Sequence, residues 1–314
     1  MPSFTQPSRI IITCSKWLSP SLQKEVSALG YTIKEQFQTG VQINGTLNDC
    51  IRLNLNLRCA SQILYSIKSF DCDSPQQLYD EIRQIQWESI FDKEGYFSIS
   101  SRVDHPSINN SLFANVKVKD AIVDRFREKF DMRPNSGSEL NDTVIHLFWR
   151  NETAEIFIDT SGETVAKHGY RKIPGHAPML ESLAAATLLS TVWDGESAFI
   201  NPMCGSGTLA IEAAMIASNR RPGLFRDSYG FMHVSGYDHK VYEREKDILK
   251  TQVKDIQGIK IIATDISEDA INISKINAGA AGVGELIEFE VCDFRDTKIP
   301  EESGVVWGEL RYYV

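Results

Sequence analysis

The chain has 314 residues, of which 42% are hydrophobic, and a formal net charge of −9. This length and composition exclude a wholly disordered chain and predict a large core divided among two or three domains. There is no run of eighteen apolar residues and no basic start followed by an apolar segment, so we expect a soluble, cytoplasmic protein. The six cysteines form no C-x-x-C pair and lie at no metal-ligand spacing with histidine, so neither a metal site nor structural disulfides are expected.

Alternating helix and strand patterns fill the first half of the chain. A strand over 9–18 precedes a helix over 19–30, for which Ser19 or Ser21 is the expected cap and Gly30 the terminator. Two strands around Gly40, a helix and strand over 49–70, a capped helix over 74–86, a strand over 96–104 and a helix over 116–130 follow. A hairpin through Asn151 joins strands 143–150 and 154–160. These units predict an α+β region with antiparallel strands before a doubly wound sheet that begins near Ala198.

The negative net charge by itself argues against binding to nucleic acid. Local clusters of basic residues could nevertheless contact RNA phosphates. Residues 102–133 hold seven basic and five acidic side chains, and Lys117, Lys119 and Arg125 are the candidate RNA contacts there. Residues 167–172 contain no acid. We interpret them as an RNA contact in which Tyr170 stacks on a base while Lys167, Arg171 and Lys172 hold phosphates, although a solvated linker is the competing interpretation.

A predicted helix is followed by a glycine-rich turn. Residues 175–192 predict a helix with Pro178 in its first turn and a face of leucine and alanine residues. The stretch NPMCGSGT, at 201–208, then follows an apolar run and opens into another apolar helix, which indicates strand, tight turn and helix. A phosphate-binding P-loop requires Lys after its last glycine, whereas Gly207 is followed by Thr208. The two glycines also fall short of the three in a dinucleotide-binding turn.

NPMCGSGT resembles the [DN]-P-x-C-G-S-G-T loop of class I S-adenosylmethionine-dependent methyltransferases, especially those that act on exocyclic amines of RNA bases. Residues 54–91, 108–135 and 157–171 look like the THUMP-domain guanine N2-methyltransferases of large-subunit ribosomal RNA, in the same order. The resemblance implies S-adenosylmethionine as cofactor, ribosomal RNA as partner and methyl transfer to the N2 amine of a guanine. It also implies a ferredoxin-like α+β segment over 1–55, a THUMP RNA-binding domain over 56–165 and a Rossmann-like methyltransferase domain over 166–314.

The expected cofactor contacts come from four segments. In the family, a helix of the type P-[LM]-x-E packs beside the methionine end of the cofactor, and a capped core helix is the alternative for this chain. Asp265 ends a β-branched strand, where a carboxylate accepts both ribose hydroxyls or else caps the next helix. Asp293 and Phe294, after the following strand, are candidates for the adenine amine and ring, or else a solvated strand end. The full set of candidates is Pro178, Met179, Glu181, Asn201, Pro202, Cys204, Gly205, Ser206, Gly207, Thr208, Asp265, Asp293 and Phe294.

The end of the chain departs from the family pattern. An N-P-P-Y loop, which binds the target amine after the fourth strand in these enzymes, is absent from the sequence, and Trp307 stands where it is expected. We therefore expect an incomplete sheet, a truncated or altered chain, and no catalytic residue from that loop. The alternatives to a guanine N2-methyltransferase are an RNA-binding protein with a non-catalytic cofactor domain and an amino-methyltransferase for DNA or protein.

Overall fold

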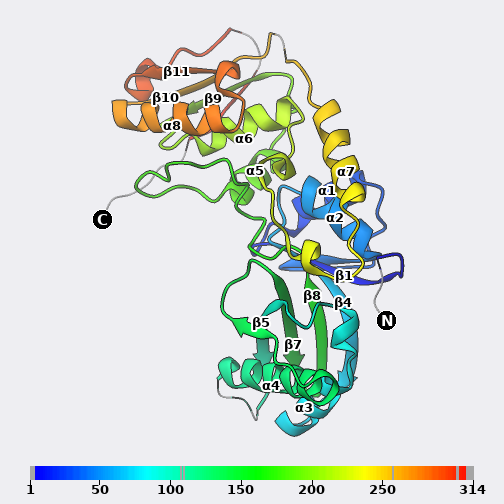
Figure 1. The fold of residues 1–314 in the computed structure, drawn as a ribbon. Coiled ribbons are helices and arrows are strands. Elements are labelled where there is room, and N and C mark those ends of the chain that lie inside the picture. The colour runs from blue at the N-terminus through cyan, green and yellow to red at the C-terminus, as the bar shows by residue number, and fades with distance from the viewer. Residues whose placement is uncertain (1–3, 107, 109, 257, 302–303, 309–314) are drawn as a thin grey trace.

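The computed structural model describes residues 4–106, 108, 110–256, 258–301 and 304–308. Within these residues the chain forms two sheets, each with its own helices, and Figure 1 shows the second sheet at one end of an elongated molecule. The first sheet has the strand order β2-β3-β1-β4-β8-β7-β5-β6, and the second has the order β11-β10-β9-β12. The predicted fold class, a Rossmann-like domain preceded by an α+β region, is confirmed.

One continuous sheet contains every described strand of the first half. Its strands are β1 (Ser8–Thr13), β2 (Glu35–Phe37), β3 (Gly40–Gly45), β4 (Gln62–Asp71), β5 (Tyr96–Asp104), β6 (Asn135–Gly137), β7 (Thr143–Arg150) and β8 (Thr153–Asp159). Strand β4 pairs with β1 on one side and with β8 on the other, so it joins the two halves of the sheet. The predicted hairpin is confirmed, because Asn151 at φ 51° turns β7 back into β8.

Local capping explains where most of the accompanying helices begin. They are α1 (Ser19–Ala28), α2 (Leu47–Asn56), α3 (Pro75–Gln84) and α4 (Ser111–Phe130), with the 3-10 turn η1 (Trp87–Ser89). Thr46 and Asp49 form a reciprocal capping box at α2, and Ser74 caps α3 through the Gln77 amide. The predicted serine cap of α1 is wrong: Leu18 precedes that helix without a side-chain cap, and the hydroxyl of Ser21 contacts that of Ser190 at 2.9 Å.

The expected antiparallel strands make up most of this sheet, but part of it is parallel. Strand β5 runs parallel to both β7 and β6. The reason is topological, since the 20-residue helix α4 crosses over between β5 and β6, and a crossover of that kind brings the chain back in the same direction.

The second sheet is parallel in all of its described pairings. Its strands are β9 (Ala198–Pro202), β10 (Ile261–Asp265), β11 (Ile287–Val291) and β12 (Gly304–Val306), and its helices are α5 (Glu181–Ser190), α6 (Thr208–Ala217) and α8 (Glu268–Ala280), with the 3-10 turns η4 (Gly284–Leu286) and η5 (Phe294–Asp296). The apolar residues of β9 and β10 and of helix α6 make a core of their own. Strand β9 begins at Ala198, as predicted.

A segment between α6 and β10 packs on the first half of the chain. It contains η2 (Pro222–Phe225), η3 (Gly230–His233) and α7 (His239–Thr251). Its aromatic side chains Tyr229, Phe231 and Tyr242 are buried in the same apolar cluster as the first sheet. Figure 1 shows α7 beside α2, which it contacts. This segment therefore shares the apolar core of the first sheet, although it lies between α6 and β10 of the second part of the chain, which the sequence did not predict.

A buried ion pair lies where the two parts meet. His168, on the segment that leads into the second sheet, lies 2.7 Å from a carboxylate oxygen of Glu212 on α6, and its other ring nitrogen lies 2.9 Å from the Arg58 carbonyl oxygen. Both side chains are fully buried. Burial disfavours the charged ring, but the Glu212 carboxylate and the Arg58 carbonyl outweigh it, so the pKa of His168 is raised.

We predict that this pair makes stability fall as the pH rises above about 6.5, the ordinary pKa of histidine. A raised pKa means that the native state holds the proton after the unfolded state has lost it, so the contribution is complete below about pH 6.5 and is lost as the pH passes the native pKa. Urea unfolding at pH 6.5 and pH 8 measures the change. The variant His168→Gln should lose less stability over this interval than the parent, while His239→Gln, at an exposed histidine, should match the parent. Equal losses in all three proteins would contradict the assignment.

Candidate functional site

A cavity of about 510 Å³ opens at the carboxyl edge of β9 and β10. It is lined by the turn after β9, the end of β10 with the start of α8, and the segment before α5. The lining residues are Pro174, Gly175, His176, Ala177, Pro178, Met179, Asn201, Met203, Cys204, Gly205, Ser206, Thr208, Leu209, Asp265, Ile266, Ser267, Asp269, Ala270 and Ile273. Open parallel sheets bind ligands at this edge, because the loops that follow neighbouring strands converge there.

The turn after β9 needs its glycines for two different reasons. Gly205 and Gly207 adopt φ values of 56° and 80°, in the left-handed region that favours glycine. A Cβ at Gly207 would lie 2.9 Å from the Ser274 side chain, so this glycine allows close packing of α6 against α8. A Cβ at Gly205 would meet nothing within 4 Å, so the backbone there faces open space. The turn therefore presents bare backbone to the cavity at the N-terminus of α6.

Asp265 stands across the cavity edge from this turn. One carboxylate oxygen accepts a hydrogen bond from the Gly205 amide at 3.0 Å, and the other accepts from the Ser267 amide at 3.0 Å. The cap of α8 is Ser267, whose hydroxyl oxygen accepts from the Ala270 amide, and not Asp265. The carboxylate is therefore held at the cavity by two backbone amides, and each of its oxygens keeps acceptor capacity beyond these hydrogen bonds.

Asn201 brings an unpaired acceptor to the same cavity. Its side chain is 1% exposed, and its amide nitrogen donates to the Trp307 carbonyl oxygen at 2.9 Å. Its amide oxygen has no hydrogen-bond partner. A buried acceptor without a partner is costly, so this oxygen favours a ligand with a donor group. Pro202 follows in β9 and is not part of the lining.

Cys204 lines the cavity as a neutral thiol. Burial raises its pKa to about 12, and its sulfur lies 3.7 Å from the Ser274 hydroxyl oxygen. A thiol with so high a pKa is not a nucleophile at neutral pH. Its contribution is therefore packing.

The segment before α5 differs from its predicted form. Pro178 and Met179 line the cavity, but α5 begins only at Glu181, so Pro178 lies outside the helix and not in its first turn. Glu181 is 4% exposed, does not line the cavity, and pairs with Arg171 at 3.1 Å. The position of Glu181 therefore does not favour the expected direct contact with a cofactor.

Asp293 and Phe294 also lie outside the cavity lining. Asp293 follows β11 and forms hydrogen bonds of 2.8 Å with the Arg295 guanidinium, which lowers the pKa of that carboxyl group. Phe294 is 54% exposed. The Phe294 ring is exposed and the Asp293 carboxylate is paired with Arg295, and neither lines the cavity. Their expected contacts with an adenine therefore stay predictions.

Two of the predicted RNA contacts in residues 167–172 require correction. Tyr170 is only 2% exposed, so its ring cannot stack on a base. Arg171 has a side chain that is 12% exposed and is used in internal contacts, so it does not present its charge to a phosphate. Lys167 and Lys172 are exposed, and their contact with RNA phosphates stays a prediction. The residues alternate between core and solvent, which the composition of the run did not reveal.

On α4 the predicted basic cluster is partly neutralised. Arg125 makes two hydrogen bonds of 2.8 Å to the Glu88 carboxylate, so its guanidinium is not free for RNA. Lys119 lies 3.8 Å from Asp120, and Lys117 lies over the Phe113 ring. Lys117 and Lys119 stay predicted contacts, whereas the prediction for Arg125 is wrong because an acid distant in sequence pairs with it.

Sequence reasoning missed Asn277, Ser274 and Glu212, which organise the site from α8 and α6. Asn277 holds the segment at 172–173, and Ser274 donates to the Gly205 carbonyl oxygen at 2.8 Å. The last part of the expected methyltransferase domain, residues 309–314, lies outside the described residues. Among the residues described, no group of three or more His, Cys, Asp and Glu could hold a metal ion, and no helix is long and apolar enough to cross a membrane.

Comparison with known families assigns each part of the chain. Residues 9–64 match the RlmL ferredoxin-like domain, residues 72–159 the THUMP domain, and residues 168–312 the RMKL-like methyltransferase domain. The chain therefore combines a THUMP domain with an RMKL-like methyltransferase domain. The same architecture occurs in the crystal structure of a possible methylase from Clostridium difficile 630, which is 28% identical with a TM-score of 0.87 over 98% of this chain and 81% of that one.

Two relatives of this chain carry the name ribosomal RNA large subunit methyltransferase K/L. The protein from Psychromonas ingrahamii is 38% identical over 297 residues, 93% of this chain and 39% of its own length. The protein from Syntrophotalea carbinolica is 33% identical over 312 residues, 97% of this chain and 44% of its own length. The chain thus spans about two fifths of the length of the curated relatives it matches.

Proposed function

We propose that this chain binds S-adenosylmethionine in the cavity at the carboxyl edge of β9 and β10 and takes part in methylating large-subunit ribosomal RNA. The observation that carries the proposal is the pairing of the bare glycine turn with the Asp265 carboxylate at one cavity. The matches to the THUMP domain and the RMKL-like methyltransferase domain, together with the names of the relatives, support it.

The chemical groups of S-adenosylmethionine match the residues around the cavity. Asp265 has acceptor capacity for the ribose hydroxyls, and the N-terminus of α6, which has no side-chain cap, favours the carboxylate of the amino-acid part. The unpaired Asn201 oxygen offers an acceptor for a donor group of the ligand or of the target. Because Cys204 is neutral, it does not compete as a nucleophile for the methyl group that the sulfonium activates.

We predict that Asp265→Ala weakens the binding of S-adenosylhomocysteine tenfold or more. Loss of a hydrogen bond to a charged group costs about 1.5–3 kcal/mol, and about 1.4 kcal/mol corresponds to a factor of ten. Calorimetric titration of the purified chain measures the affinity. Asp247→Ala, which removes an exposed carboxylate on α7, serves as the matched control and should bind as the parent does. Equal affinities of the parent and Asp265→Ala would show that the ribose assignment is wrong.

The finer proposal names the exocyclic N2 amine of a guanine as the methyl acceptor. The THUMP domain and the motifs shared with guanine N2-methyltransferases support it. S-adenosylmethionine held in the cavity would supply a methyl group activated by its sulfonium; transfer to the amine would leave S-adenosylhomocysteine, and the amine proton would pass to water. Positioning and lone-pair orientation would then supply most of the catalysis. Trp307 follows β12, and its indole nitrogen only donates, so it cannot accept a hydrogen bond from the amine.

We predict that any methylated product made from unmodified large-subunit ribosomal RNA is N2-methylguanosine, formed more slowly by this chain than by the relative from Psychromonas ingrahamii. The expected cause is that residues 1–314 contain no N-P-P-Y tetrapeptide to accept hydrogen bonds from the target amine. Labelled methyl incorporation followed by nucleoside analysis gives both rate and product. Methylated adenosine as the product would overturn the guanine assignment. Binding of S-adenosylhomocysteine without any methyl transfer would favour the alternative, an RNA-binding protein with a non-catalytic cofactor domain.

We predict that Lys167 and Lys172 contribute to RNA binding through phosphates, because both are exposed on the segment that leads into the cavity. Replacing both with glutamate should weaken binding to ribosomal RNA fragments to a similar degree whatever their sequence, and should reduce the dependence of affinity on salt. Filter binding at two salt concentrations measures both effects. Lys250→Glu with Lys298→Glu makes the same change of charge at other exposed lysines and should have the smaller effect. The reverse order would place the RNA elsewhere.

A further inference from the structure

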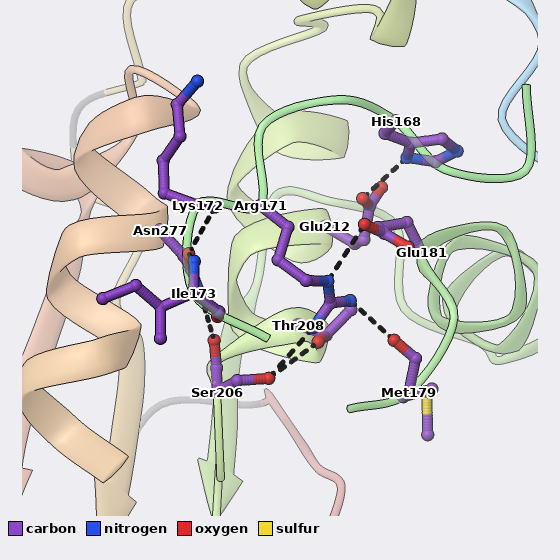
Figure 2. Close-up of polar contacts among 10 residues, drawn as sticks. All are labelled: His168, Arg171, Lys172, Ile173, Met179, Glu181, Ser206, Thr208, Glu212 and Asn277. Carbon is purple, nitrogen blue, oxygen red and sulfur yellow. Dashed lines mark hydrogen bonds and ion pairs between the residues drawn. The ribbon is translucent and has the colours of Figure 1, made fainter. Parts of the chain in front are cut away.

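The segment 168–173 connects the first half of the chain to the cavity and is fixed at both ends. At its start, His168 contacts Glu212 and the Arg58 carbonyl oxygen, as described above. At its end, Arg171 and Asn277 hold it against the turn after β9, and Figure 2 shows these side chains converging on Ser206. Neither Arg171 nor Asn277 lines the cavity. Any effect of theirs on a ligand must therefore act through neighbouring residues.

Arg171 uses its guanidinium to join three separate pieces of the site. Its Nε donates to Glu181 at 3.1 Å, one terminal nitrogen donates to the Ser206 hydroxyl oxygen at 3.1 Å, and the other donates to the Met179 carbonyl oxygen at 2.6 Å. Ser206 and Met179 both line the cavity, from opposite segments. A planar, forked donor fixes these directions together, which a lysine ammonium does not.

Asn277 completes the connection from the other side. Its side-chain oxygen accepts the amides of Lys172 at 2.9 Å and Ile173 at 3.0 Å. Its side-chain nitrogen donates to the Ile173 carbonyl oxygen at 2.8 Å and to the Ser206 carbonyl oxygen at 3.3 Å. Asn277 is 1% exposed, and all four of its hydrogen-bonding positions are used. Helix α8 therefore holds the segment and the turn in one geometry.

We propose that Arg171 and Asn277 are positioning residues for the amino-acid end of the methyl donor, an inference that rests on the proposed function. Arg171 joins the turn at Ser206 to Met179, and Asn277 joins the same turn to Lys172 and Ile173. The proposed ribose contact is a different residue, Asp265, which bonds to the Gly205 amide. The donor's amino-acid end is thereby placed by a segment whose other end is anchored beside Arg58, in the first half of the chain.

Two ligands separate this role from general support of the fold. S-adenosylhomocysteine carries the amino-acid part, and 5′-methylthioadenosine lacks it while keeping the ribose and adenine. Arg171→Met and Asn277→Asp should each bind S-adenosylhomocysteine about tenfold more weakly than the parent, the factor that about 1.4 kcal/mol produces. Both should bind 5′-methylthioadenosine within about twofold of the parent. Asn277→Asp keeps the acceptor and the shape but loses both donors, so it provides the test if Arg171→Met does not fold.

Arg226→Met is the matched control. Arg226 donates to four backbone carbonyl oxygens away from the cavity, at Ser161, Glu163, Thr164 and Ser228, so its loss tests the general cost of removing a bonded arginine. Its affinity for both ligands should equal that of the parent. Arg171→Lys should restore only part of the lost affinity, because an ammonium does not reproduce the fork.

The outcomes are distinguishable. If the parent binds S-adenosylhomocysteine and both variants bind it equally well, the positioning role is wrong and the proposed function stands. Loss of both ligands in equal proportion also contradicts the positioning role, because it indicates a general disturbance of the cavity. If the parent binds neither ligand, the proposed function fails and this inference fails with it.

Discussion

The buried contact between His168 and Glu212 is the constraint on which the geometry of the site depends. It joins the segment that leaves the first sheet to the helix that begins at the glycine turn, and the Arg58 carbonyl oxygen ties both to the first half of the chain. Removing one partner of such a buried pair leaves an uncompensated charge, at a cost of about 3–5 kcal/mol. Arg171 follows three residues later, so its reach to Ser206 depends on where His168 is held.

The shared core adds a second restraint on how the two sheets are placed. The segment with η2, η3 and α7 interrupts the methyltransferase domain yet buries its aromatic residues against the first sheet. Close backbone approaches at Gly223 and Gly230 leave no room for a Cβ, the first against Leu55 and the second against the Asp159 carbonyl oxygen. An interface of buried aromatics and close backbone contacts resembles a domain core more than a mobile hinge. The THUMP domain therefore holds a set position relative to the cavity.

Residues 167–172 have side chains that face in two different directions. Lys167 and Lys172 face solvent, whereas His168, Tyr170 and Arg171 face inward and support the cavity. Within these six consecutive residues, the exposed side chains could contact phosphates and the buried side chains support the cavity. The proposed RNA contacts and the proposed positioning of the cofactor are in this way linked by the covalent chain itself.

The sequence by itself determined the features that depend on local backbone chemistry. The strand, glycine turn and helix at 198–217, the carboxylate that ends β10 and the hairpin at Asn151 were all predictable, because glycine conformations and residue periodicity act over a few positions. Only the tertiary structure decided which charges remain free. Arg125 and Arg171 read as cations for RNA, yet Glu88 and Glu181 pair with them. Asn277, Glu212 and the aromatic residues of the inserted segment carry no local pattern, because their partners lie far away along the chain and only folding brings them together.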